Sequence, residues 1–442
     1  MNRLPIAALC LALAACASYA PLPLDRQAAP KRSLQELQHD GALPDWLGMD
    51  DIAALALRNN PDLVAARAQR GVAQAQLLIA GIPPNPSLSA GYAILLGGPG
   101  PGNVNAITAG LNQDLRSLVT LSARRSAARA TVREVDASLL WQEWQTVGKA
   151  RLQAVDLVEG EAQLRLLRQN AALLQDRLQR SRKALGQGDT TLATLAPDLA
   201  AAADAQKQLD DAGRQQESRR RDLAAFLGLS PEAALPLDEA VTVPPIDAAA
   251  VLQSLPDLAD RRPDLVALQL GYRAQEAQVR AAILGQFPML SFGVSGGRDN
   301  SGIRSLGPQL TMDLPIFDRN QGNIALERAT RQQLHDEFGA RLVAADAEVR
   351  ALLADQALLQ QQLAARRPQL AELERSAAGA EDAYRAGNLD ERGYVDLLSA
   401  RNAKQQEILA MEQSLLEQQV AIAILTGAGM PPVAFDTAEA QR

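Results

Sequence analysis

Hydrophobic and polar residues follow two different periods along the chain, and each period predicts one kind of element. Stretches rich in alanine, leucine and glutamine, with few prolines or glycines, are typical of helices. Six such helices are predicted, at residues 61–82, 117–185, 192–227, 263–285, 320–385 and 392–425. Short alternating segments beside glycine-rich turns predict four strands, at about 87–94, 106–115, 289–295 and 305–314. The predicted fold class is mainly α with a small β part.

The two longest helices exceed what a globular core needs. At about 1.5 Å per residue, the helix at 117–185 is about 100 Å long. A pattern of this length without internal caps predicts packing as a coiled coil or as the staves of a helical barrel. The matching helix at 320–385 is predicted to break and kink at Pro368, because proline removes an intrahelical hydrogen bond.

The same order of elements occurs twice. Asn-Pro-Asp-Leu-Val-Ala at 60–65 returns as Arg-Pro-Asp-Leu-Val-Ala at 262–267, and the register continues through the later elements with one three-residue length difference. A duplication of such long period indicates a symmetric assembly rather than a catalytic cleft. The chain is therefore divided into a first structural repeat, a proline-rich linker and a second structural repeat, at 53–230, 231–262 and 263–430.

The amino terminus carries an export signal. A basic start and an apolar run form a signal peptide over 1–15, too short to span a bilayer as a helix. Leu-Ala-Ala-Cys at 13–16 resembles a bacterial lipobox, which implies acylation of Cys16 as the first mature residue. Ala17 is not the aspartate associated with inner-membrane retention, so an outer-membrane location is expected. The alternative is an ordinary signal peptide that contains a cysteine.

The segments at the two ends of the mature chain are expected to be loosely structured. Residues 16–52 read as an extended segment that follows the lipid anchor, and residues 431–442 as a flexible tail.

Composition argues against several classes of function. The net charge of −7, without a basic run, argues against nucleic acid as a partner. The cysteines are Cys10 and Cys16, so the mature chain has no free thiol for a disulfide, a metal or a nucleophile. The histidines, His39 and His335, lack metal-ligand spacing. We therefore expect no enzyme activity, no cofactor and no bound metal.

The predicted strands require an oligomer if they cross a membrane. No stretch after Cys16 has 18 consecutive apolar residues, so no transmembrane helix is predicted and a crossing needs a closed β-barrel. Four strands cannot close a barrel, because small barrels need about eight. Three chains would form a trimeric 12-stranded barrel, continued by the long helices as a periplasmic α-helical barrel. Soluble surface hairpins are the alternative.

Several motifs resemble one known family. Asn-Pro-Asp-Leu at 60–63, Pro-Asn-Pro at 84–86 and the duplicated plan resemble the TolC-type outer-membrane efflux proteins, over nearly the whole chain after about residue 50. The run at 314–324 is similar to the family signature where the last strand enters the long helix. It includes the junction residues Pro315, Phe317, Asp318, Arg319 and Gly322. Its Phe-Asp-Arg-Asn-Gln-Gly form is similar to the heavy-metal (CzcC-type) branch.

The resemblance implies a passive channel in a tripartite efflux pump. It implies a homotrimer in outer-membrane lipid, joined by a periplasmic adaptor protein to an inner-membrane resistance-nodulation-division pump. The exported substrates would be small toxic compounds or heavy-metal ions. Two alternatives stay open, namely the outer-membrane duct of a type I protein secretion system and a non-conducting coiled-coil periplasmic lipoprotein.

The turns between long and returning helices are the expected gate. By resemblance, Tyr384 and Gly387 match the tyrosine and glycine of the family's periplasmic tip, and Gly188 matches in the first repeat. Carboxylates near the tip are expected to form a ring around the three-fold axis unless they pair, for example with Arg385 or Arg392. These carboxylates are Asp189, Asp390, Glu391 and Asp396. Solvated turn and cap residues are the alternative.

The two tips are expected to differ in function. Relative to the family pattern, the second tip has about three extra residues, Asp390, Glu391 and Arg392. Since the second repeat also holds Pro368 and the single copy of the junction signature, it is the expected place of gating.

Overall fold

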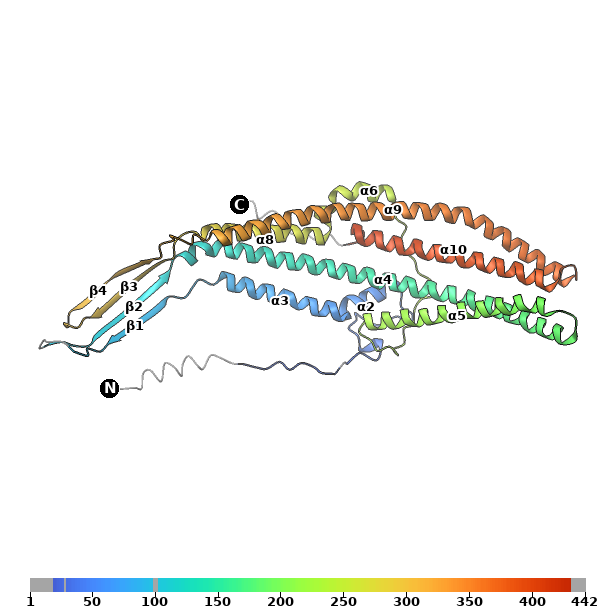
Figure 1. Ribbon diagram of the computed structural model, residues 1–442, viewed down its shortest axis with the longest axis horizontal. Coiled ribbons are helices and arrows are strands. Elements are labelled where there is room, and N and C mark those ends of the chain that lie inside the picture. The colour runs from blue at the N-terminus through green and yellow to red at the C-terminus, as the bar shows by residue number, and fades with distance from the viewer. Residues whose placement is uncertain (1–18, 28, 98–101, 431–442) are drawn as a thin grey trace.

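The structure, a computed structural model, describes residues 19–27, 29–97 and 102–430. The molecule is a long rod, with strands at one end, helices along the remaining length and helix turns at the far end (Figure 1). The predicted signal peptide, the acylation site at Cys16 and the tail at 431–442 lie outside the described residues, so they stay predictions.

Two antiparallel helical hairpins form most of the rod. The first hairpin consists of α4, Arg116–Gln187, and α5, Leu192–Phe226. The second consists of α9, Gln321–Arg385, and α10, Glu391–Thr426. Together with the four strands described below, these helices confirm a mainly helical fold with a small β part.

Helix α9 passes through Pro368 without interruption, so the predicted break is wrong. The helix is continuous over Gln321–Arg385 with the proline inside it, and α5 likewise continues through Pro197. Proline removes one backbone hydrogen bond, but most helical stability in proteins comes from tertiary packing. Contacts with α10 lie on both sides of Pro368, since Arg367 donates to Glu412 and Glu374 accepts from Gln405.

Two shorter helices lead into the strands. Helix α3, Pro61–Gly81, is capped by Asn60, whose side-chain oxygen accepts a hydrogen bond from the Leu63 amide at 2.9 Å. Its counterpart is α8, Pro263–Leu284, and both helices have proline in the first turn. Helix α3 packs on α4, α4 on α8, and α8 on α9, so the four helices lie side by side in the order of the strands (Figure 1).

Short elements thicken the middle of the rod. The N-terminal segment forms η1, Leu34–Glu36, and α2, Met49–Asn59. The segment expected as a linker carries three elements, which are α6, Ala248–Ser254, η2, Leu255–Asp257, and α7, Leu258–Arg261. Each group buries apolar side chains against the helices beneath. Residues of α2, α4 and α5 share one core, and residues of α6, η2, α7, α8, α9 and α10 share another.

The four strands form one antiparallel sheet in the order β1-β2-β3-β4. Their bounds are Ser87–Ala93, Ala106–Asp114, Leu290–Arg298 and Arg304–Met312. The outer edges of β1 and β4 have no strand partner within the described part of the chain.

The sheet has one apolar face and one face of small polar residues. Residues directly opposite each other in neighbouring strands lie on the same face. The apolar face carries Leu88, Tyr92, Ile107, Leu111, Leu290, Phe292, Val294, Leu306, Leu310 and Met312, together with Gln113 and, at its hairpin end, Arg298 and Arg304. The other face carries Ser89, Thr108, Gly110, Asn112, Ser291, Gly293, Ser295, Gly297, Ser305, Gly307, Gln309 and Thr311. Most of the large apolar side chains are exposed, with Leu88 at 79% and Leu306 at 81%.

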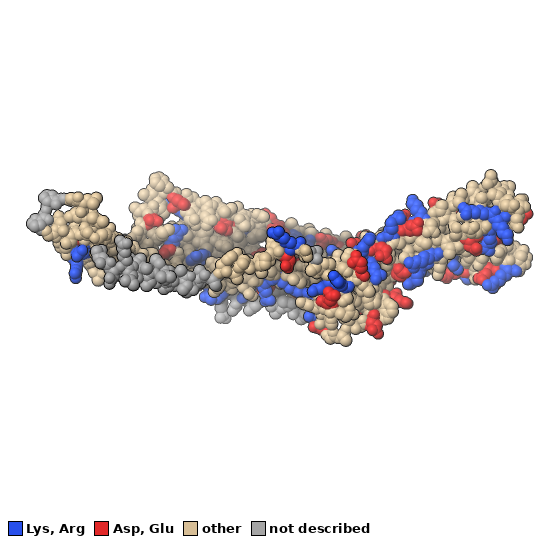
Figure 2. Space-filling view, turned by 90° about the horizontal axis from the view of Figure 1, so that it is seen from below, with Lys and Arg blue, Asp and Glu red and all other residues tan. Residues whose placement is uncertain are grey.

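Charge is distributed unevenly along the rod. Figure 2 shows Lys, Arg, Asp and Glu side chains gathered over the helices, whereas the strand end is nearly uncharged. Among the described helices, α10 is long and apolar enough to cross a membrane by length and composition. It packs against α9 and α4, and core helices of similar composition meet the same criterion.

Candidate functional site

The far end of the rod consists of two glycine-bearing turns. Gly188 ends α4 with φ +81°, and Gly387 follows α9 with φ +75°. Only glycine adopts this left-handed conformation without strain, so both glycines are required by the turns. Asp390 begins α10, and its Oδ1 accepts a hydrogen bond from the Gly393 amide at 2.9 Å.

A buried ion pair lies about three turns behind the first glycine. Arg177 of α4 and Asp198 of α5 are 8% and 3% exposed. The Arg177 Nε donates to Asp198 Oδ1 at 2.8 Å, and Nη2 donates to the same oxygen at 2.5 Å. Both residues belong to the first hairpin, so this pair ties α4 to α5.

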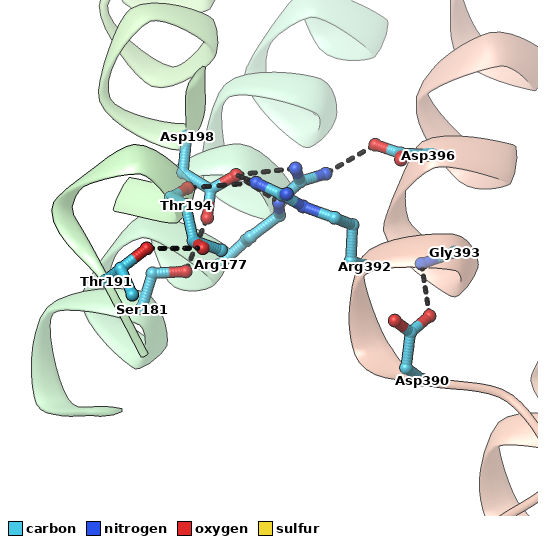
Figure 3. Close-up of polar contacts among 9 residues, drawn as sticks. All are labelled: Arg177, Ser181, Thr191, Thr194, Asp198, Asp390, Arg392, Gly393 and Asp396. Atoms are coloured by element: carbon cyan, nitrogen blue, oxygen red, sulfur yellow. Dashed lines mark hydrogen bonds and ion pairs between the residues drawn. The ribbon is translucent and has the colours of Figure 1, made fainter. Parts of the chain in front are cut away.

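The second hairpin joins this ion pair from the other side (Figure 3). Arg177 Nη1 donates to Asp396 Oδ1 of α10 at 2.5 Å. Arg392 Nη2 donates to Asp198 Oδ1 at 2.8 Å and to the Thr194 carbonyl at 3.0 Å. These three hydrogen bonds cross from one hairpin to the other. We call the group Arg177, Asp198, Arg392 and Asp396 the tip network.

Neighbouring contacts complete the connection between the hairpins. Arg180 Nε of α4 forms an ion pair with Glu391 Oε1 of α10 at 2.5 Å. Ser181 donates its hydroxyl hydrogen to Asp198 Oδ2, which gives the buried carboxylate a partner on each oxygen. Polar groups this deeply buried are stable only when hydrogen-bonded, and Asp198 meets that condition.

The electrostatics of the tip network favour charged side chains. Burial alone raises the pKa of Asp198, but hydrogen bonds from Ser181, Arg392 and Arg177 outweigh it, so the pKa lies below its usual value. Burial alone lowers the pKa of Arg177, but hydrogen bonds to Asp198 and Asp396 hold it above its usual value. The buried pair of Arg177 and Asp198 is therefore ionised at neutral pH.

Apolar contacts support the same junction. Val395 of α10 is 1% exposed and packs into the core formed by α4 and α5, which contains Ala171, Leu174, Leu178, Ala202 and Ala205. Tyr384 of α9 stacks on Tyr394 of α10, with ring centroids 5.1 Å apart and planes 3° apart. The start of α10 is thus held by one buried apolar side chain, one stacked pair and the tip network.

The expected tip residues take different positions. Gly188, Gly387, Tyr384 and the four carboxylates all lie at or within about three turns of the tip, but they do not form one cluster. Asp189 is exposed in the turn, Asp390 caps α10, and Glu391 and Asp396 pair with arginines. Within one chain, two of the four carboxylates are therefore neutralised.

The expected arginine partners of these carboxylates are wrong. Arg385 pairs with Glu381 of its own helix, and Arg392 pairs with Asp198, a residue outside the expected set. The pairing partners of Glu391 and Asp396 are Arg180 and Arg177, which come from the first repeat. The reason is the antiparallel alignment of α10 with α4, which brings the second tip against the flank of the first.

Sequence analysis missed Arg177, Arg180, Ser181, Thr194 and Asp198. A usable pattern existed, because Asp198 occupies a core-facing position in a helical stripe with Leu195, Ala202, Ala205 and Leu209. A carboxylate at an apolar position predicts a buried partner. Which residue supplies that partner depends on tertiary alignment.

The strand-to-helix junction contains no such network. Arg319 Nε donates to the Pro315 carbonyl at 3.3 Å, and Asp318 Oδ1 accepts from the Asn320 amide at 2.8 Å. Phe317 is 91% exposed, and a Cβ on Gly322 would meet nothing within 4 Å. These contacts form the turn that starts α9. Among the described residues, no group of three or more His, Cys, Asp or Glu side chains is arranged to hold a metal ion.

The fold and the site together define a class of elongated proteins in which a four-stranded sheet continues into long helical hairpins. A family model for outer membrane efflux proteins matches residues 255–428. The pyoverdine export outer membrane protein OpmQ of Pseudomonas putida is 28% identical, over 95% of this chain and 96% of its own length. Through these matches the chain is similar to the outer membrane efflux proteins, the TolC-type family. It is a protein of the outer membrane.

Two solved structures share this fold. A structure of CusC has a TM-score of 0.67 at 19% identity, covering 92% of this chain and 98% of its own. The Campylobacter jejuni CmeC outer membrane channel has a TM-score of 0.70 at 17% identity, covering 86% of each chain. At these identities the likeness concerns the fold. These relatives are channel proteins rather than enzymes.

Proposed function

We propose that the protein is the passive outer-membrane duct of a tripartite efflux pump, that it works as a homotrimer, and that the helix tips form its gate. The observation that carries the proposal is the two-faced sheet. One face is an exposed and largely apolar surface, with Arg298 and Arg304 at its hairpin end, and soluble monomers rarely expose a patch of that kind. Lipid would cover it, while the small polar face would line water.

The open edges of the sheet support three copies. Unpaired strand edges are not tolerated in lipid, so β1 and β4 each require a partner. Pairing of β4 with β1 of the next copy would close a ring of 12 strands from three chains. Helix α3 would lie at the same junction, and it exposes Val64, Val72, Leu78, Ile79 and Ile82. A neighbouring copy would bury these side chains.

The tip network supports a gate. Its interhelical hydrogen bonds hold α10 against the first hairpin, and they break if the second hairpin moves outward. Asp198 would keep Arg177 and Ser181 after such a movement, because all three lie in the first hairpin. The hydrogen bonds between the hairpins therefore stabilise the closed state. When they break in the open state, Asp198 still has Arg177 and Ser181 as partners.

Partners and cargo are further parts of the proposal. The family suggests a periplasmic adaptor at the tips and an inner-membrane resistance-nodulation-division pump as the energy source, while Cys16 would carry the lipid anchor. The relative named for pyoverdine export favours a small-molecule cargo, and the junction signature favours heavy-metal ions. Such a duct should bind its cargo weakly, because conduction requires release.

Reconstitution into planar bilayers tests the duct. The purified protein is expected to conduct ions, with larger conductance when Arg392 is replaced by Met. A protein that spans the bilayer but shows no conductance, even with Arg177 or Arg392 replaced, would support the non-conducting lipoprotein instead. For the cargo, a deletion strain should become sensitive to metals or drugs. A strain that loses only a secreted protein would indicate a type I secretion duct.

A further inference from the structure

Helices α4 and α10 meet along a seam made mainly of polar pairs. Moving from the tip towards the middle, Asn402 Nδ2 donates to Asn170 Oδ1 at 3.3 Å, and Gln163 Nε2 donates to Gln413 Oε1 at 2.9 Å. The seam ends where Trp144 Nε1 donates to the Ile424 carbonyl at 3.0 Å. Between the apolar contacts of Val395 near the tip and Ile424 at the middle, the two hairpins therefore share polar pairs that water can replace.

Two carboxylates share one buried amide in this seam. Gln413 is 7% exposed, and its Nε2 donates to Asp156 Oδ1 at 2.8 Å and to Glu417 Oε1 at 2.7 Å. An amide nitrogen carries two hydrogens, so both are used. Gln413 thus holds a carboxylate of α4 and a carboxylate of α10 next to each other. Carboxylates this close ionise together only at a substantial free-energy penalty.

The positive charges near Asp156 and Glu417 compensate only part of the negative charge of these two carboxylates. From α5, Arg219 Nη2 lies 3.9 Å from Asp156 Oδ1, while Nη1 donates to the Asp156 carbonyl. From α9, the segment 356–365 contains no charged residue. One turn nearer the tip, Glu159 faces Glu412, with Arg165 near the former and Arg367 bonded to the latter. One arginine therefore faces the two carboxylates.

The geometry favours a shared proton. Burial raises the pKa of Glu417, a hydrogen bond with Asp156 adds to the increase, and the contacts with Gln413 and Arg219 offset only part of it. Glu159 follows the same pattern, since burial and Glu412 raise its pKa more than Arg165 lowers it. Both effects act at the line where the hairpins meet.

We propose that Asp156, Gln413 and Glu417 form a proton-sensitive clasp between the two hairpins. One proton shared by the carboxylates holds α10 against α4, and loss of that proton makes the carboxylates repel each other. A carboxyl group whose pKa is raised by folding contributes stability below its unfolded pKa, and that stability is lost as pH rises through the raised value. The seam is therefore tighter at low pH and loosens as the pH rises through the raised pKa of Glu417.

A distance measurement on the full-length protein in detergent tests the clasp. Spin labels are attached to cysteines introduced at Gln169 and Ala403, two exposed positions beside the Asn170–Asn402 contact. Residues 19–430 contain no native cysteine that would also react with the label. Between pH 5 and pH 8, the distance distribution of the labels is expected to lengthen. The expected size of the change depends on how far closure of the seam raises the pKa of the carboxylate pair. For each pKa unit, the ratio of closed to loosened molecules changes by about tenfold.

Three variants make the test decisive. Glu417→Gln and, separately, Asp156→Asn are expected to keep the acid-like distribution at both pH values, because an amide cannot lose a proton in this range. Glu161→Gln is the matched control, since Glu161 lies on the same helix but pairs with Arg168. It is expected to behave like the unmodified protein. A distribution independent of pH in the unmodified protein, or an unchanged pH response in both pair variants, would overturn the clasp.

The role of the clasp in gating rests on the proposed channel, but the distance measurement does not. If the distance between the labels changes with pH as expected but the protein never conducts, the result supports the clasp and contradicts the proposed channel. If the protein conducts but the distance between the labels is independent of pH, the result supports the proposed channel and contradicts the clasp.

Discussion

Arg392 is the residue whose replacement most directly tests the tip network as a gate. Its guanidinium reaches from α10 to two acceptors of the first hairpin, Asp198 Oδ1 at 2.8 Å and the Thr194 carbonyl at 3.0 Å. Arg392→Met keeps an unbranched side chain and removes both hydrogen bonds. Asp198 keeps Arg177 and Ser181 as partners, so no unpaired charge remains in the first hairpin. The substitution therefore weakens the connection between hairpins without disrupting either one.

The size of the effect follows from exposure. Hydrogen bonds that involve a charged group contribute about 1.5–3 kcal/mol when buried. The Arg392 side chain is 39% exposed, so solvent screening brings its total contribution to about 1.5 kcal/mol, the low end of that range. A loss of this size shifts an equilibrium by about tenfold. Asp396→Asn should shift it less, because the Asp396 side chain is 61% exposed.

Single-channel recording at pH 7 measures the shift. Arg392→Met is expected to raise the ratio of open to closed time by about tenfold. Arg385→Met is the matched control, because Arg385 lies at the same tip and pairs only within its own helix. An unchanged ratio for Arg392→Met, or an equal increase for Arg385→Met, would refute the assignment of gating to the tip network.

Three further predictions concern acid, the sheet and the anchor. Because the pKa of Asp198 is lowered, its stabilisation is present above the usual aspartate pKa and lost as pH falls through the lowered value, so channel recordings should show opening in strong acid. Val294→Arg places a charge on the apolar face, which should destabilise the membrane-inserted protein by about 2–4 kcal/mol and reduce its yield. Ser295→Arg, on the other face, should insert normally, and equal yields of the two variants would contradict the two-faced sheet. Cys16→Ala should abolish acylation, and an unchanged mass and membrane fractionation would exclude the lipid anchor.

Long elements were predictable from local pattern, but their pairing was not. The bounds of α4 and α9 lie within two residues of the expected ranges, because both helices extend over many turns of one period. The prediction at Pro368 failed because a local rule was applied where packing along α10 decides. The tip network was missed because Arg177 and Asp396 lie 219 residues apart in sequence. Only the antiparallel alignment of the two hairpins brings them together.

The extra residues at the second tip show where family resemblance stops being informative. Asp390, Glu391 and Arg392 are the residues that depart from the expected family pattern, and each has a defined contact. Asp390 caps α10, Glu391 pairs with Arg180, and Arg392 reaches Asp198. The family pattern therefore gives no guide to the contacts of these three residues.

The kinds of contact also determine which parts can move relative to each other. Within the first hairpin, α4 and α5 bury Leu174, Leu178, Ala202 and Ala205, and separating them would expose apolar surface at about 25 cal/mol per Å². Between the hairpins, Val395 is buried in the core of the first hairpin, and the seam also contains several hydrogen bonds, which contribute only about 0.5–1.5 kcal/mol each because water can replace them. Each hairpin should therefore move as a unit, and opening should follow the α4–α10 seam. At its middle end, Gly148 allows Ile424 to approach so closely that a Cβ would meet Ile424 Cγ1 at 2.6 Å, so this end is tightly packed and is the expected pivot.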